Sequence, residues 1–142
     1  VQGPIQDPQP LPYLQTQNAN FDIDLHLEIK TPKMDTYQEI AHTNYKYMYW
    51  DIAQQVTHHT INGCNLQPGD ILGTGTISGP TPDSYGSLIE LTWNGANPIY
   101  LNSREERTYL ADNDSMQVIA WARKDDLCIG LGSAEATVLA SD

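Results

Sequence analysis

The chain has 142 residues and a net charge of −11, from 18 acidic and 7 basic side chains. Its length suits one domain, and its 39% of hydrophobic residues indicate a chain that folds rather than stays disordered. The acidity argues against binding to nucleic acid or to anionic membranes, because both require basic residues that neutralise phosphates. No apolar run approaches the roughly 20 residues that a membrane-spanning helix needs, and no signal peptide is recognisable at the N-terminus.

The N-terminal segment is rich in proline. Its prolines are Pro4, Pro8, Pro10 and Pro12. Proline fixes the backbone angle φ and lacks an amide donor, so residues 1–20 are expected to form an extended arm. The arm is either a flexible tail or a connector, and a start at Val1 rather than Met agrees with a connector. Residues 21–142 are expected to form the β-rich portion.

The first regular segment lies at Phe21–Lys30, where apolar and polar residues alternate. Alternation over ten residues is typical of a strand with one face toward solvent. Thr31–Lys33 is a turn, and Met34–His42 is expected to return as the second strand of a hairpin. His26 falls on the polar face, so its side chain is expected to be solvated.

One substantial helix is expected after this hairpin. Asn44 is a suitable N-cap, apolar residues recur at helical spacing as far as Thr60, and Gly63 stands where a left-handed residue ends many helices. Its many aromatic residues suit either a core or a subunit interface. His58 and His59 point about 100° apart and cannot chelate one metal ion as an i, i+4 pair can. Each is expected to make a capping or buried polar contact, and contact with a substrate is the alternative.

The rest of the chain combines turns with short strands. Strands are expected at Ile71–Ser78, Ser87–Trp93, Pro98–Leu101, Met116–Arg123, Leu127–Leu131 and Ala134–Leu139. Asn94–Gly95 indicates a hairpin turn, and Ser103–Arg107 a polar loop. The fold class is therefore mainly β with one substantial helix, arranged as a mixed β-sandwich or roll.

The two cysteines, Cys64 and Cys128, are far apart in the sequence and form neither a zinc pair nor a Cys-x-x-Cys motif. Cysteine behaves as a small hydrophobe, so both are expected to be unpaired, buried structural thiols. Free thiols suit a reducing cytosol.

The most informative segment for chemistry carries two glycines around Thr74. Gly73 and Gly75 weaken a strand and are tolerated where a backbone or a ligand approaches closely. On such a strand the hydroxyls of Thr74, Thr76 and Ser78 would share one face. They either face a ligand or belong to a bulged strand packed against another backbone.

Glu90 is the second candidate, because it lies in an expected strand that is otherwise suited to burial. A buried carboxylate needs hydrogen-bond donors, and such groups gather at functional sites. The alternative is that Glu90 faces solvent. The sequence contains no Ser-His-Asp motif, phosphate-binding glycine loop, Glu-x-Glu metal pair or His/Cys cluster.

Several motifs closely resemble the C-terminal part of the fumarylacetoacetase family. They are Met48–Trp50, Gln54–Leu66, Pro68–Asp70, Gly75–Gly79 and Ile89–Trp93. The resemblance extends from Asp7 to Leu139. The run His-His-x-x-Asn-Gly-Cys-Asn-Leu is specific to this family, whereas Pro-Gly-Asp followed by Gly-Thr is shared with a wider superfamily that acts on oxo acids. Gln67 replaces an arginine that is common in the family.

The resemblance implies a hydrolase that cleaves a carbon–carbon bond of the diketo acid fumarylacetoacetate, in the catabolism of tyrosine and phenylalanine. It implies Mg²⁺ or Ca²⁺ held by carboxylates and a histidine base that activates water. By position, Thr76 corresponds to a substrate contact and Glu90 to the carboxylate that orients the base. The family's metal ligands, histidine base and substrate-binding Arg, Lys and Gln precede the proline-rich arm. This chain is therefore expected to bind no metal and to be inactive, or nearly so, by itself.

The resemblance further implies a cytoplasmic homodimer, for which the aromatic helix offers a physical reason. Two alternatives stand beside this interpretation. One is a non-enzymatic dimerisation or binding module with the same fold, and the other is a different oxo-acid hydrolase of the superfamily.

Overall fold

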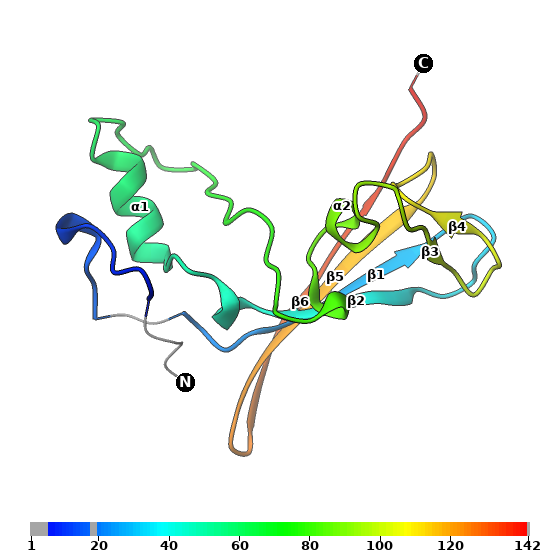
Figure 1. Cartoon of the computed structure of the whole chain (residues 1–142), viewed down its shortest axis with the longest axis horizontal. Coiled ribbons are helices and arrows are strands. Elements are labelled where there is room, and N and C mark those ends of the chain that lie inside the picture. Colours follow the sequence, from blue (N-terminus) through cyan, green and yellow to red (C-terminus); the bar gives the residue numbers. More distant parts are fainter. Residues whose placement is uncertain (1–5, 18–19, 142) are drawn as a thin grey trace.

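The computed structural model describes residues 6–17 and 20–141 (Figure 1). Val1 and Pro4 of the expected arm lie outside the described residues. The part of the arm that is described contains the short 3-10 turn η1 (Pro12–Leu14), whose Leu14 is buried. The backbone oxygen of Leu14 accepts a hydrogen bond of 2.7 Å from the side chain of Gln54, so the arm is tied to the helix that follows.

Four strands form one antiparallel sheet in the order β2-β1-β5-β6. Their bounds are Asp24–Lys30 for β1, Gln38–Asn44 for β2, Ser115–Lys124 for β5 and Leu127–Thr137 for β6. β1 pairs with β2 across the turn, which confirms the first hairpin although both strands begin later than expected. β5 pairs with the other side of β1 and carries β6 on its far edge.

β6 replaces the last two expected strands with one continuous strand. The register with β5 shifts where Ala120 faces Gly132 and Trp121 faces Gly130, so Leu131 is an extra residue in a β-bulge. Gly132 has a φ of +82°, a conformation that side-chain-bearing residues rarely adopt. The end of the first expected strand and the gap after it therefore form a bulge within one continuous strand.

The substantial helix is α1 (Ile52–Thr60), which begins later than expected. Asn44 caps the 3-10 turn η2 (Tyr45–Tyr47) instead, and the chain is extended at Met48. The cap of α1 is Asp51, whose carboxylate accepts a 2.7 Å hydrogen bond from the backbone N–H of Gln54.

The Gln54 side chain completes the capping box by accepting a 2.9 Å hydrogen bond from the backbone N–H of Asp51. Gly63 has a φ of +88° just beyond the helix, as expected. None of the helices found in the described part of the chain is long and apolar enough to cross a membrane.

Two of the expected strands are wrong. Ile71–Ser78 has no regular secondary structure, and most of Ser87–Trp93 forms the short helix α2 (Leu88–Leu91). The Ser87 side chain caps this helix by accepting from the backbone N–H of Glu90. The Asn94–Gly95 pair ends a helix rather than joining two strands, since the backbone N–H of Asn94 donates to Ile89 at 2.7 Å.

A second, two-stranded sheet pairs β3 (Ile99–Tyr100) with β4 (Glu106–Arg107). β3 falls within the expected Pro98–Leu101 strand, whereas β4 occupies the end of the expected polar loop. The 3-10 turn η3 (Pro82–Ser84) precedes α2. The fold is thus mainly β and antiparallel with one substantial helix, as predicted.

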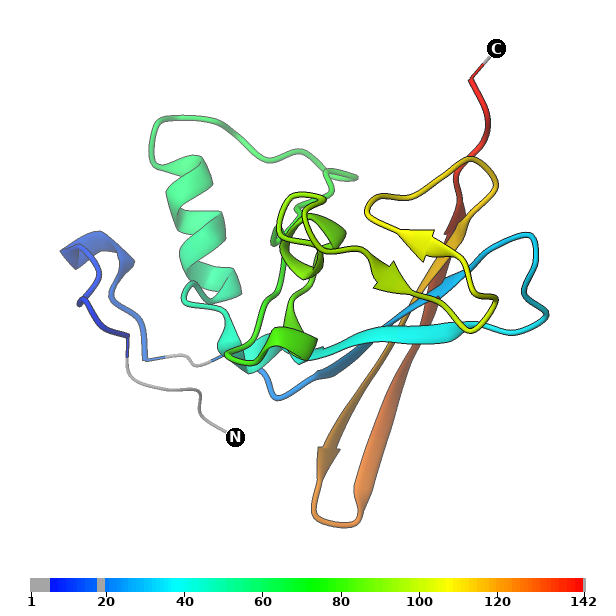
Figure 2. The ribbon, with the colours of Figure 1, turned by 45° about the vertical axis from the view of Figure 1, so that its right-hand side comes forward.

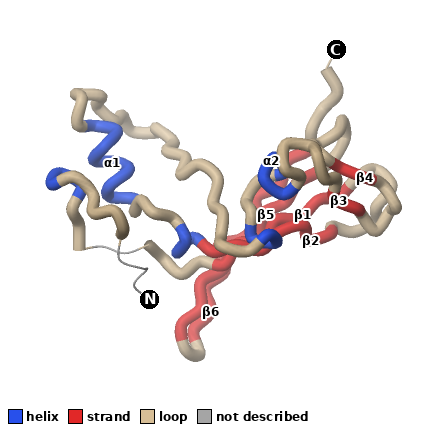
Figure 3. Tube along the Cα trace, in the orientation of Figure 1, coloured by secondary structure: helices blue, strands red, loops and turns tan. Residues whose placement is uncertain are grey.

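The molecule is extended rather than spherical. Helix α1 and the arm lie at one end, and α2 with the small sheet lies beside the large sheet at the other (Figure 2). A long irregular segment joins α1 to α2 (Figure 3). The buried apolar residues found among residues 6–17 and 20–141 are Leu14, Ile29, Ala41, Tyr45 and Leu101.

His26 is less exposed than its place on the polar face predicts. Its side chain is 17% exposed and contacts Glu39 through Nδ1. Its ring stacks between His42 and Trp121, with centroid separations of 4.1 and 4.2 Å. The expectation of a solvated side chain is wrong because aromatic side chains on the two neighbouring strands cover the ring.

Both cysteines are unpaired, as expected, but both are exposed. Cys64 lies in the loop after α1, and Cys128 lies on the edge strand β6. The prediction of burial is wrong because neither position is covered by another element of the described chain.

Candidate functional site

Glu90 and Ser78 meet although they lie 12 residues apart in the sequence. The Ser78 hydroxyl lies 3.1 and 2.9 Å from the two carboxylate oxygens of Glu90. The Ser87 hydroxyl donates to the Oε2 atom at 2.7 Å. Glu90 itself is exposed, so the solvent-facing alternative is confirmed and burial in a strand is wrong.

A closed turn brings these residues together. The backbone N–H of Gly79 donates to the carbonyl of Ser84 at 2.9 Å, and the hydroxyl of Ser84 donates to the carbonyl of Thr81 at 2.7 Å. The chain thereby reverses between residues 79 and 86, and Ser78 comes to lie beside the first turn of α2.

Gly86 allows the two arms of this turn to touch. A Cβ atom at Gly86 would lie 2.2 Å from the carbonyl oxygen of Ile77, where no side chain fits. The N–H of Gly86 also donates to the Ser78 hydroxyl at 3.0 Å. The position of the Ser78 hydroxyl against Glu90 therefore depends on a glycine eight residues further along the chain.

Asp83 is an acidic residue within the turn that separates Ser78 from α2. A hydrogen bond from the Thr81 side chain is the main reason why the pKa of Asp83 lies below its ordinary value. The lowered pKa keeps the Asp83 carboxylate ionised at neutral pH.

Thr76 lies two residues before Ser78 and is exposed. The backbone around it is irregular, with a φ of +76° at Gly75, and the Thr74 hydroxyl donates to the carbonyl of Gly75 at 3.1 Å. The expected strand with three hydroxyls on one face is therefore wrong. Ser78 contacts Glu90 and lies two residues after Thr76 in the sequence.

The arrangement suits Glu90 to accept a further hydrogen bond. The two serine hydroxyls orient its carboxylate, while its exposure leaves the group accessible to a donor from outside this chain. A carboxylate held in this way can fix the tautomer and raise the basicity of an imidazole that donates to it. The site can therefore position a base, but it supplies no base of its own among the residues that contact Glu90.

His58 and His59 do not join this site. Their polar partners are the Tyr13 hydroxyl, 3.1 Å from Nδ1 of His58, and the Cys64 sulfur, 3.4 Å from Nε2 of His59. Both histidines are exposed on the last turn of α1, which lies away from α2 in both views (Figures 1 and 2). The expectation of a capping or buried polar contact for each histidine is wrong, because both contacts are made by exposed side chains.

No group of three or more His, Cys, Asp or Glu side chains that could hold a metal ion occurs among residues 6–17 and 20–141. The Glu90 carboxylate has serine hydroxyls as its partners, and these are weak metal ligands beside carboxylate or imidazole. The described residues therefore do not fit a metal ion.

Ser87 is a site residue that the sequence analysis missed. The spacing Ser87-Leu88-Ile89-Glu90 is that of a helix N-terminal capping box, and this signal could have identified both the helix and the contact. The contact of Ser78 with Glu90 has no comparable local signal, because it depends on the intervening turn.

Comparison with known proteins supports one family. The family model described as "Fumarylacetoacetate (FAA) hydrolase C-terminal" matches residues 7–139. The chain is similar to proteins named fumarylacetoacetase from Dictyostelium discoideum (49% identity), Arabidopsis thaliana (47%) and Homo sapiens (45%). These similarities cover 98%, 99% and 98% of this chain, respectively, and 33% of each relative. The chain thus spans about a third of the length of the curated relatives it matches.

Proposed function

Because this chain belongs to the fumarylacetoacetate hydrolase family and matches its C-terminal part, we propose that it is the C-terminal portion of an enzyme that hydrolyses fumarylacetoacetate to fumarate and acetoacetate. The observation that carries the proposal is the identity of 45–49% to three fumarylacetoacetases along almost the whole chain. Since the chain covers a third of those proteins, we propose that it has little or no activity alone.

Within this enzyme, Glu90 acts as a positioning residue. Its carboxylate accepts a hydrogen bond from a histidine base that the rest of the protein supplies, and the hydroxyls of Ser78 and Ser87 hold it in place. Thr76 contacts the substrate with its exposed hydroxyl. The support for these roles is the contact network around Glu90, the exposure of Thr76 and the match to the family.

A chimera tests the proposal. In this chimera the chain replaces the corresponding third of the Dictyostelium relative, to which it is 49% identical. We expect the chimera to release fumarate and acetoacetate from fumarylacetoacetate, and the isolated chain to show no turnover under the same conditions. A chimera that folds but is inactive contradicts the proposal, and release of other products from another oxo acid favours a different hydrolase of the superfamily.

The variant Glu90→Gln in the chimera tests the positioning role. General acid–base catalysis contributes about a hundredfold or more, so we expect kcat to fall by about that factor while KM changes little. Glu106→Gln is the matched control, because Glu106 is also an exposed carboxylate but lies on β4. An unchanged kcat in the Glu90→Gln chimera would show that Glu90 takes no part in the mechanism.

We also propose that the complete enzyme binds its divalent cation, Mg²⁺ or Ca²⁺, through ligands that lie outside this chain. Isothermal titration of the isolated chain with either ion measures this, and we expect no binding heat. Saturable binding by the chain contradicts the proposal.

We propose further that the enzyme is a cytoplasmic homodimer in which the aromatic side chains around α1 contribute to the subunit interface. Tyr47 and Trp50 are exposed, which supports this use of the region. The exposed thiols of Cys64 and Cys128 agree with a reducing compartment. Light scattering of the chimera measures its mass, and a monomer contradicts the dimer.

A further inference from the structure

The chain exposes more surface than a compact protein of its mass. Its accessible surface is 9815 Å² for 15.8 kDa. Compact monomers of this mass expose about 7,300 Å², so the excess is about 2,500 Å². An excess of accessible surface of this size indicates that another polypeptide segment packs against this chain.

The β5–β6 hairpin is one exposed part of the chain. β1 pairs with β5 as far as Asp24 and Trp121, so the hairpin continues beyond the other two strands (Figures 1 and 2). β6 is exposed along all 11 of its residues, and in the described part of the chain it pairs with β5 alone. Its outer edge therefore presents unpaired backbone groups.

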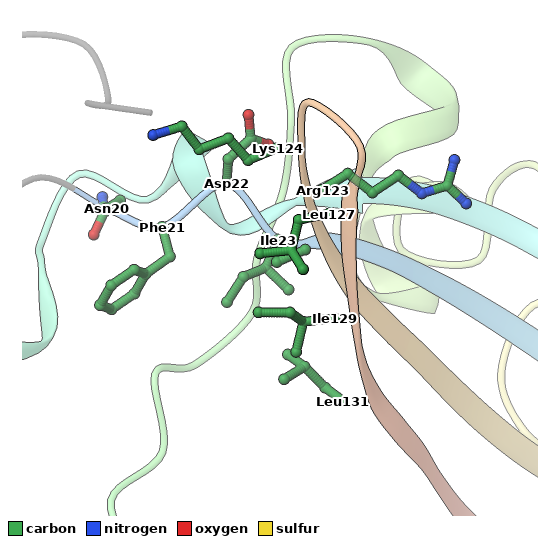
Figure 4. Close-up of a pocket in the computed structure, with 10 residues that line it drawn as sticks. Asn20, Phe21, Asp22, Ile23, Arg123, Lys124, Leu127, Ile129 and Leu131 are labelled. Atoms are coloured by element: carbon green, nitrogen blue, oxygen red, sulfur yellow. The ribbon is translucent and has the colours of Figure 1, made fainter.

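Apolar side chains gather on one face at this end of the sheet. We call this the hairpin face; it consists of Phe21, Ile23, Leu127, Ile129 and Leu131. The three β6 residues are 61%, 52% and 57% exposed, and Phe21 is 58% exposed. The face lines a hollow of about 490 Å³ (Figure 4).

Alternation along the strand explains the apolar lining. Leu127 and Ile129 are two residues apart and share a side of β6, and Ile129 lies opposite Ala122 of β5, which also lines the hollow. Arg123 extends away from the apolar side chains (Figure 4). An apolar face beside an open strand edge has the features of a site for strand addition.

We propose that the hairpin face and the outer edge of β6 bind an apolar strand from the part of the enzyme that lies outside this chain. The identity of this partner rests on the proposed function, because about two-thirds of each relative lies outside the match. A standard interface covers about 800 Å² on each partner, so a second copy alone would leave most of the excess surface uncovered.

Co-expression tests the proposal directly. The partner is the two-thirds of the Dictyostelium relative outside the match, co-expressed with the affinity-tagged 142-residue chain. We expect the two to elute together, and the pair of changes Ile129→Asp and Leu131→Asp to lower recovery of the partner at least tenfold. The matched control is Cys128→Asp with Ser133→Asp, which adds the same charge at exposed positions of β6 outside the hairpin face and should keep most of the recovery.

Two results of this experiment overturn the proposal. One is failure of the unchanged chain to retain the partner. The other is equal recovery with the hairpin-face variant and its control. We expect the hairpin-face variant to lose the partner but to form dimers of the chain as readily as the unchanged chain does. If the variant instead loses its dimers and keeps the partner, the hairpin face binds a second copy.

A labelling experiment in the chimera does not depend on association or on a charged variant. Ile129→Cys is placed in a background with Cys64→Ser and Cys128→Ser, and its reaction with a maleimide is timed. We expect the reaction to be at least tenfold slower in the chimera than in the isolated chain, and Glu106→Cys on β4 to react alike in both. If the chimera is active but residue 129 reacts as fast as in the isolated chain, the binding of a strand to the hairpin face is contradicted and the proposed function is not. If the chimera is inactive but residue 129 is protected, the proposed function is contradicted and the binding of the strand is not.

Discussion

Glu105 shows how short polar side chains set the charge state of one carboxylate. The hydroxyls of Thr31 and Ser103 donate to its Oε2 atom at 2.6 and 2.8 Å, and Lys33 lies 3.4 Å from Oε1. The hydrogen bond from Thr31 is the largest of the effects that lower the pKa of Glu105 to about 2. Because Thr31 lies in the β1–β2 turn, the ionised carboxylate joins this turn to the segment before β4.

The stability contributed by Glu105 depends on pH. Its pKa in the folded chain lies below the ordinary value of 4.5, so the contribution is present above pH 4.5 and is lost as pH falls toward 2. Thr31→Val removes the hydrogen bond that is the main cause of the lowered pKa of Glu105. The stability contributed by Glu105 should then be lost at a higher pH than in the unchanged chain. Urea unfolding at several pH values and an NMR titration of Glu105 measure both effects, with Thr36→Val as an exposed control. A midpoint near 4.5 in the unchanged chain contradicts this prediction.

Arg107 and Asp114 form a second charged contact that is more deeply buried. Arg107 donates to the two carboxylate oxygens of Asp114 at 2.7 and 3.0 Å, and the Asp114 side chain is fully buried. The hydrogen bonds to Asp114 are the main reason why the pKa of Arg107 is raised. The backbone N–H of Ala111 also donates to Asp114, at 2.8 Å.

Removing this carboxylate should therefore destabilise the fold. Asp114→Ala leaves the Arg107 charge without its main partner, and we expect the free energy of unfolding to fall by about 3 kcal/mol. Asp112→Ala, at an exposed position of the same turn, should change it by less than about 0.5 kcal/mol. Equal denaturation midpoints for the two variants would exclude an important role for the ion pair.

At the scale of elements, the connection between the irregular segment and α2 depends on Gly86. In Gly86→Ala the new Cβ would collide with the carbonyl oxygen of Ile77, and the segment that carries Ser78 must move. We expect a loss of about 1–3 kcal/mol of stability and, in the chimera, a lower kcat because Glu90 loses a hydroxyl partner. Gly73→Ala is the control, since no atom lies within 4 Å of its added Cβ. Similar effects of the two variants would contradict this account.

Elements with long-range periodicity could be predicted from the sequence, and short ones could not. The alternation in β1 extends over the whole strand and identifies it. Residues 87–93 alternate too, but the helix they form has only four residues, too few to distinguish the helical period from the strand period. The N-cap at Ser87 favours the helix. Ile71–Ser78 has the composition of a strand but no partner strand in the described chain.

The start of α1 could have been predicted better. Asp51 and Gln54 have the spacing of a capping box, whereas the tyrosines before them suggested an earlier start. The candidate site shows a different limit. Family resemblance singles out Thr76 and Glu90, but the contact of Glu90 with Ser78 depends on the turn closed by Gly86, which local patterns do not reveal.

At the scale of the whole molecule, the strands of the large sheet differ in how many neighbours they have and in how deeply they are buried. β1 lies between two strands, and its Ile29 is fully buried, so its amides are hydrogen-bonded within a covered part of the sheet. β6 has one neighbour and is exposed along its length. Stability against local opening should therefore decrease from β1 toward β6.

Hydrogen exchange can measure this gradient and also the state of the outer edge. In the isolated chain, alternate amides of β6 point away from β5 and should exchange almost as fast as amides of an unfolded peptide, while β1 amides remain protected. In the chimera, the fast amides of β6 should become protected, because an added strand accepts their hydrogen bonds. Uniform protection of β6 in the isolated chain would mean that a second copy already occupies the edge. The alternating pattern therefore tests, without any substitution, whether the edge of this sheet is open in the isolated chain and covered in the chimera.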